Sequence, residues 1–154
     1  MKNHWKVLIF CILLPLAVGG AASLLSNNGM EAFQSINQPP LSPPAWLFPV
    51  VWTILYTLMG ISSYLILTSE EENIRVAGIL YGCQLLVNFL WPAFFFNFQW
   101  YLFSFLWLLF LIVLVIAMIR EFYKISKPAA YLNIPYLLWL LFAAYLNFAI
   151  WKLN

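Results

Sequence analysis

The chain has 154 residues, of which 65% are hydrophobic and 8% are charged, and its formal net charge is +2. Soluble domains carry about one-quarter charged residues, so this composition excludes an ordinary soluble enzyme and predicts an integral membrane protein. A spanning helix needs about 20 apolar residues. The length therefore suits one all-α domain, residues 1–154, with five transmembrane helices.

Apolar runs between charged residues predict the positions of these helices. The stretch between Arg75 and Arg120 contains no Asp, Glu, Lys or His, and at about 1.5 Å per residue it can cross the bilayer twice. A tight turn at residues 97–100 would join the two crossings. The runs are continuous rather than alternating, which argues against a β-barrel. We predict helices at residues 5–26, 45–68, 75–97, 100–123 and 128–152.

The first predicted helix has an alternative interpretation as a cleaved signal peptide. Lys2 and Lys6 precede an apolar stretch, and the small residues at 19–23 are typical of a cleavage site. The apolar run continues through Leu24 and Leu25. This length favours a helix that is retained in the membrane.

Residues 27–44 form a long connection that is rich in proline. Proline fixes φ and holds the preceding residue in an extended conformation, so we expect no helix above the membrane here. Phe33, Ile36 and Leu41 argue against disorder, and connections of this length are usually functional when they are ordered. We interpret the segment as a stiffened lid over the outer mouth of the bundle; a plain spacer is the alternative. The lid prolines are Pro39, Pro40, Pro43 and Pro44.

Aromatic residues make up 19% of the chain, and many, such as Trp151, lie near helix ends where an interfacial belt is expected. Four tryptophans lie deeper than a belt. At about 1.5 Å per residue, Trp52, Trp91 and Trp107 lie about 10 Å from the outer helix ends, and Trp139 lies about 20 Å from them. These rings therefore lie just above and just below one level of the membrane.

Three of the predicted helices place such rings beside small or uncharged polar residues at helical spacing. This arrangement suits the wall of a pocket for a flat, apolar ligand. The alternative is that the stripes pack helix on helix, with Asn88 and Asn147 hydrogen-bonded between helices. The stripes are Trp52 and Tyr56; Gln84, Asn88, Trp91 and Phe95; and Trp139, Ala143, Leu146 and Ile150.

No arrangement typical of conventional catalysis or of a metal site occurs in the sequence. Cys11 and Cys83 lie in separate apolar helices without metal-binding or haem-attachment spacing, and His4 is the only histidine. The central parts of the second to fifth helices carry no Asp, Glu, Lys, Arg or His. This pattern argues against proton-coupled or ion-coupled transport.

Lysine and arginine side chains predict the orientation in the membrane. With five crossings, the N-terminus and the second and fourth connections share one side, and Lys152 alone lies on the other. The positive-inside rule then places the N-terminus in the cytoplasm and the C-terminus outside. The basic residues on the inner side are Lys2, Lys6, Arg75, Arg120, Lys124 and Lys127.

Several segments resemble the signatures of the translocator protein family, also called tryptophan-rich sensory proteins (TspO/MBR). The segments are LLPLAVGG (13–20), PPAWLFPVVWTILYTLMG (43–60), LYGCQLLVNFLWPAFFF (80–96) and PYLLWLLFAAYLNFAIW (135–151). The resemblance implies a bacterial member, a five-helix bundle in the cell membrane that forms a homodimer and has no nucleic-acid partner. Residues 13–20 match the first-helix pattern, which supports retention of that helix.

The resemblance also implies the ligands: porphyrins and haem-like tetrapyrroles, sterols, and synthetic aromatics such as isoquinoline carboxamides. Porphyrin is then a ligand or substrate rather than a tightly bound cofactor, and we expect recognition by shape and stacking without iron ligation. Phe89 replaces a tryptophan of the family, and Phe148 replaces the tyrosine of its sterol motif. The candidate ligand-binding residues are Trp52, Tyr56, Gln84, Asn88, Phe89, Trp91, Trp139, Ala143 and Leu146.

Three functional classes remain open at this point. The first is a receptor or sensor of tetrapyrroles. The second is a light-dependent porphyrin-degrading activity, with Trp52 and Trp139 as the catalytic redox partners. The third is a transporter of lipids, sterols or tetrapyrroles.

Overall fold

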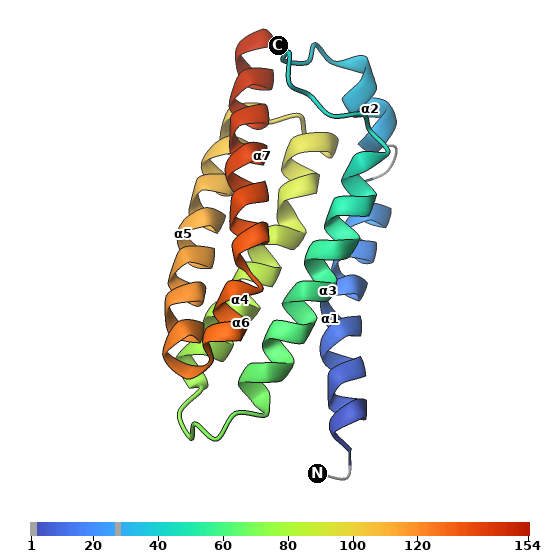
Figure 1. Cartoon of the computed structure of the whole chain (residues 1–154). Helices are drawn as coiled ribbons and strands as arrows, with labels where there is room; N and C mark the ends of the chain where they lie inside the picture. The colour runs from blue at the N-terminus through green and yellow to red at the C-terminus, as the bar shows by residue number, and fades with distance from the viewer. Residues whose placement is uncertain (1–2, 27–28) are drawn as a thin grey trace.

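The computed structural model describes residues 3–26 and 29–154, and it is a bundle of five long helices (Figure 1). All five are long and apolar enough to cross a membrane, which confirms the predicted all-α fold. We call the end of the bundle at which α7 and the chain finish the upper end; α1 begins at the opposite end. The long helices are α1 His4–Leu25, α3 Leu47–Leu67, α4 Arg75–Pro92, α5 Tyr101–Ile125 and α7 Ile134–Leu153.

Two of the predicted spans are divided by changes of helix geometry. At Pro92 the α4 helix passes into the π-helical segment η1 (Ala93–Asn97). The last span, predicted as one helix over 128–152, begins as the short helix α6 (Lys127–Tyr131) and resumes as α7 after a turn. Pro135 lies in the first turn of α7, where its missing N–H needs no helical partner.

The connection before α3 contains a helix that we did not predict from the sequence. This helix, α2 (Gly29–Ser35), lies at the upper end of the bundle (Figure 1). The expectation of no helix here is wrong for this part, because Pro39 follows the end of α2 and restricts only itself and its preceding residue. Asn27 and Asn28 of the predicted connection, and Lys2 of the predicted inner charges, lie outside the described residues.

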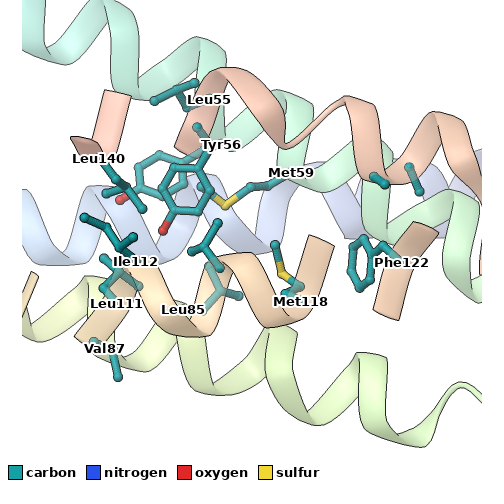
Figure 2. Packing of buried hydrophobic residues seen from close by; sticks show 14 of the residues in the cluster. Leu55, Tyr56, Met59, Leu85, Val87, Leu111, Ile112, Met118, Phe122 and Leu140 are labelled. Atoms are coloured by element: carbon teal, nitrogen blue, oxygen red, sulfur yellow. The ribbon is translucent and has the colours of Figure 1, made fainter. Parts of the chain in front are cut away.

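Dense packing fills the middle and lower parts of the bundle. Met59, Val115 and Met118 have no exposed surface, and Figure 2 shows the two methionines among the packed side chains. At Gly60 of α3 an added Cβ would lie 2.6 Å from the carbonyl oxygen of Cys11 in α1. Because helices in lipid associate through close packing and hydrogen bonds, this contact holds α1 against α3. The open space lies higher in the bundle.

Candidate ligand-binding cavity

A cavity of about 600 Å³ lies in the upper half of the bundle. Side chains from all five spanning helices, from η1 and from α2 line it, and the described lining carries no charged residue. Its size falls within the range of about 300–1,000 Å³ typical of small-molecule sites. Phe95 of a predicted stripe also lines the cavity. The lining residues that we did not predict include Leu16, Gly19, Gly20, Ser23, Phe33, Phe48, Pro49, Thr53, Leu108, Leu111 and Asn147.

Most of the candidate ligand-binding residues meet at this cavity, because helical spacing put them on one face of each helix. Gln84 and Phe89 do not line it. Gln84 is fully buried elsewhere in the core, and Phe89 is half-buried one position around the helix from Asn88. The candidates that line the cavity are Trp52, Tyr56, Asn88, Trp91, Trp139, Ala143 and Leu146.

A chain of buried hydrogen bonds runs from the cavity wall into the core. The Tyr56 hydroxyl donates to Asn88 Oδ1 at 3.2 Å, and Asn88 Nδ2 donates to the Tyr136 hydroxyl at 2.8 Å. The Tyr136 hydroxyl in turn donates to Gln84 Oε1 at 2.7 Å. Trp52 stacks on Tyr56 with ring centroids 5.3 Å apart. The chain joins α3, α4 and α7 and fixes the amide of Asn88.

A second amide ties three helices together beside the cavity. Asn147 Oδ1 accepts a hydrogen bond from the Trp91 indole N–H at 3.1 Å, and Asn147 Nδ2 donates to the Tyr101 carbonyl at 2.8 Å. The interpretation that Asn147 bonds between helices is therefore confirmed. The same bond commits the Trp91 N–H, so that group is not available to a ligand.

The indole N–H groups of Trp52 and Trp139 differ from that of Trp91. Neither has a hydrogen-bond acceptor among the residues that the structure describes, although both rings line the cavity. An unpaired indole N–H is a donor and never an acceptor. Two residues of the cavity wall therefore carry an indole N–H that is not bonded to another described residue.

The upper part of the cavity is closed by rings that sequence reasoning missed. Phe33 of α2 meets Phe48 edge to face at a centroid distance of 5.0 Å, and Phe48 meets Trp139 at 5.9 Å. Phe33 is 6% exposed. The only signal in the sequence was its apolar character, which it shares with Ile36 and Leu41 of the same connection.

The four lid prolines do not line the cavity, whose upper lining from this segment comes from Phe33 and Ala45. Pro39 is buried, Pro43 is half-buried, and Pro40 and Pro44 are exposed. The prolines therefore do not cover the cavity with their own side chains, and their effect is on the backbone of the connection.

Trp107 was predicted at the same level as the cavity tryptophans, but its ring makes its contacts away from the cavity. Its indole N–H donates to the Val87 carbonyl at 2.8 Å, and its ring packs against Phe94 and Phe103. It does not line the cavity. The direction of this side chain could not be predicted from the sequence.

Gly19 is a small residue on the α1 side of the cavity whose size is required. An added Cβ there would collide with the Tyr56 ring and lie 2.8 Å from its Cδ2 atom. Gly19 therefore lets α1 approach α3 at the level of the cavity. The adjacent glycines at 19 and 20 are the only feature of the α1 sequence that could have pointed to this contact.

Comparison with known proteins agrees with this architecture. The TspO/MBR family pattern matches residues 11–152. The chain is 37% identical to the tryptophan-rich protein TspO of Chlorobaculum tepidum, with 100% of this chain and 99% of that protein aligned. It is 33% identical to the translocator protein of Bos taurus, covering 100% and 94%, and 32% identical to the tryptophan-rich sensory protein of Cereibacter sphaeroides, covering 100% and 95%. The chain belongs to the TspO/MBR family.

Proposed function

We propose that the protein is a membrane receptor that binds flat, largely apolar ligands, porphyrins foremost and isoquinoline carboxamides among synthetic compounds, in the upper cavity. The observation that carries this proposal is an uncharged cavity of about 600 Å³ walled by Trp52, Trp91 and Trp139. Aromatic walls favour stacked or edge-to-face contact with flat rings. The names of the relatives, sensory protein and translocator protein, are compatible with such a role.

The unpaired indole donors suggest how a ligand is oriented. A carbonyl or carboxylate oxygen would accept from Trp52 or Trp139, while the apolar ring system packs among the neighbouring side chains. The described lining contains no His, Cys or Met. Recognition by shape, stacking and two hydrogen bonds, without an axial ligand to iron, therefore suits a porphyrin here.

The surroundings of the site complete the proposal. We place the upper end outside a bacterial cell membrane, because Lys6, Arg75, Arg120 and Lys124 lie at the lower end and Lys152 at the upper end. The described part of the predicted lid, residues 29–44, then acts as an outer lid with Phe33 as its buried apolar contact. We also propose a homodimer, by analogy with the family.

One observation favours a second candidate, the light-dependent degradation of porphyrin. Trp52 lines the cavity and stacks on Tyr56, with 29° between the ring planes. Tyr56 in turn is hydrogen-bonded to Asn88. A photo-excited porphyrin in the cavity would thus lie beside an oxidisable indole that is backed by an oxidisable phenol.

The test is a titration with protoporphyrin IX of the chain reconstituted in lipid nanodiscs, followed by quenching of tryptophan fluorescence. We expect saturable quenching in the native chain and at least about ten-fold weaker binding in Trp52→Phe and Trp139→Phe, since each loses a donor and ring area. Trp151→Phe is the control, because Trp151 does not line the cavity.

Unsaturable quenching that is equal in all four proteins would refute the proposal, because it would show that porphyrin only partitions into lipid. Repeating the titration under illumination tests the second candidate. A new porphyrin product that forms with the native chain and not with the double variant Trp52→Phe Trp139→Phe would establish degradation, and its absence would leave a receptor.

A further inference from the structure

Among the described lining residues, those that are exposed lie on one side of the cavity. Four of its described lining residues are exposed, Gly20 and Ser23 on α1 and Pro49 and Thr53 on α3. The described lining residues on α2, α4, η1, α5 and α7 are buried or half-buried. We call the gap bordered by these four residues the α1/α3 opening.

The upper end of the cavity is covered by packed side chains. Phe33, Phe95 and Ile150 are 6%, 3% and 1% exposed and form one apolar cluster. Above them, hydrogen bonds between Asn37 and Asn154 connect the segment before α3 to the end of α7, and we call this pair the Asn37–Asn154 clasp. Asn154 Nδ2 donates to the Asn37 carbonyl at 3.0 Å, and the Asn37 N–H donates to Asn154 Oδ1 at 3.3 Å.

Helical spacing places the opening between α1 and α3 rather than elsewhere around α3. Thr53 and Pro49 precede Gly60 by seven and eleven residues, so they share its face of the helix. That face meets α1, because Gly60 lies against the backbone of Cys11 and Ile12. The helix backbones therefore meet closely at Gly60, and Pro49 and Thr53 lie above that contact on the same face of α3.

The α1 side of the opening is formed by two small residues, Gly20 and Ser23. An added Cβ at Gly20 would have no neighbouring atom within 4 Å, whereas one at the adjacent Gly19 would collide with Tyr56. Gly20 is thus not required for helix packing. On the α3 side the Thr53 hydroxyl donates to the Pro49 carbonyl at 2.7 Å, so this polar group is satisfied where it borders lipid.

From these observations we propose that ligands reach the cavity sideways from the membrane, through the α1/α3 opening, and not through the clasped upper end. This inference rests on the proposed function. It narrows the ligand class to flat molecules that partition into the hydrocarbon region, where apolar ligands are concentrated from water. The Asn37–Asn154 clasp then stays closed while ligand exchanges.

Stopped-flow measurement of protoporphyrin IX exchange, in nanodiscs preloaded with the porphyrin, tests the route. Leucine is introduced on each side of the opening, as Gly20→Leu and Thr53→Leu. Gly82→Leu is the matched control, because Gly82 is exposed, does not line the cavity and also has open space around an added Cβ. A third variant, Asn37→Ala with Asn154→Ala, releases the clasp.

We expect both the association and the dissociation rate constants to fall together by about ten-fold in the two leucine variants, since a barrier on the path slows both directions. The control and the clasp variant should exchange at the native rate. Two results would overturn the inference: native rates in both leucine variants, or faster exchange in the clasp variant. If the native chain shows no saturable binding, the proposed function fails and this inference fails with it.

Discussion

The hydrogen-bond chain below the cavity makes a specific prediction for Tyr136→Phe. The hydroxyl of Tyr136 accepts from Asn88 at 2.8 Å and donates to Gln84 at 2.7 Å, and the residue is 1% exposed. Its removal leaves one amide N–H and one amide oxygen buried without these partners. Each such group costs about 1–3 kcal/mol in a protein interior, and hydrogen bonds in membrane proteins average about 0.6 kcal/mol. We expect a loss of about 1–4 kcal/mol of unfolding free energy.

The assay is equilibrium unfolding in mixed micelles with increasing SDS, followed by circular dichroism. Tyr145→Phe on the same helix is the control, because Tyr145 is exposed and makes no hydrogen bond among the described residues. Adding Gln84→Met to Tyr136→Phe removes the unpaired amide oxygen, so the double variant should lose less than the sum of the two single losses. Equal stability of Tyr136→Phe and Tyr145→Phe, or simple additivity, would refute the reasoning.

Three further predictions concern close contacts and the second amide. Gly60→Ala should destabilise the protein by about 1–3 kcal/mol in the same unfolding assay, because α1 must move away from α3, and Gly78→Ala, which meets open space, should not. Gly19→Ala should weaken protoporphyrin IX binding in the quenching titration by displacing the Tyr56 ring, and equal affinities of Gly19→Ala and Gly20→Ala would contradict this. Asn147→Leu should lower the unfolding free energy by about 1–3 kcal/mol, since the Trp91 N–H and a backbone carbonyl lose their partner; native stability would disprove it.

The spans and much of the cavity wall could be predicted because the relevant signals are local. Continuous apolar runs that are long enough to cross the membrane, bounded by the few charged residues, locate the helices. Trp139, Ala143 and Leu146 share a stripe by helical spacing, and they do meet at the cavity. The uncharged polar side chains of Asn88 and Asn147 within apolar spans indicated hydrogen bonds between helices, and both residues make them.

The remaining part of the site depends on how the helices are turned toward one another. Helix α1 is apolar on all sides, so the sequence marks no inner face, and the contribution of Gly19 was visible only as a small-residue pair. In the sequence Tyr136 is one of many aromatic residues in an apolar run. The structure shows that its hydroxyl is hydrogen-bonded to the side-chain amides of Asn88 and Gln84. The α2 helix ends before the prolines and is not restricted by them. The position of its Phe33 depends on tertiary packing against Phe95 and Ile150 at the upper end, which the sequence does not show.

The most direct measurement is the equilibrium binding of protoporphyrin IX to Ala143→Phe in nanodiscs. Ala143 lines the cavity, and a benzyl group there would occupy the space that we assign to the ligand, whereas Ala149 on the same helix does not line it. We predict saturable binding to the native chain and to Ala149→Phe, and a loss of affinity of at least about ten-fold in Ala143→Phe with its helicity retained. Native affinity in a folded Ala143→Phe protein would contradict the account and place the ligand elsewhere.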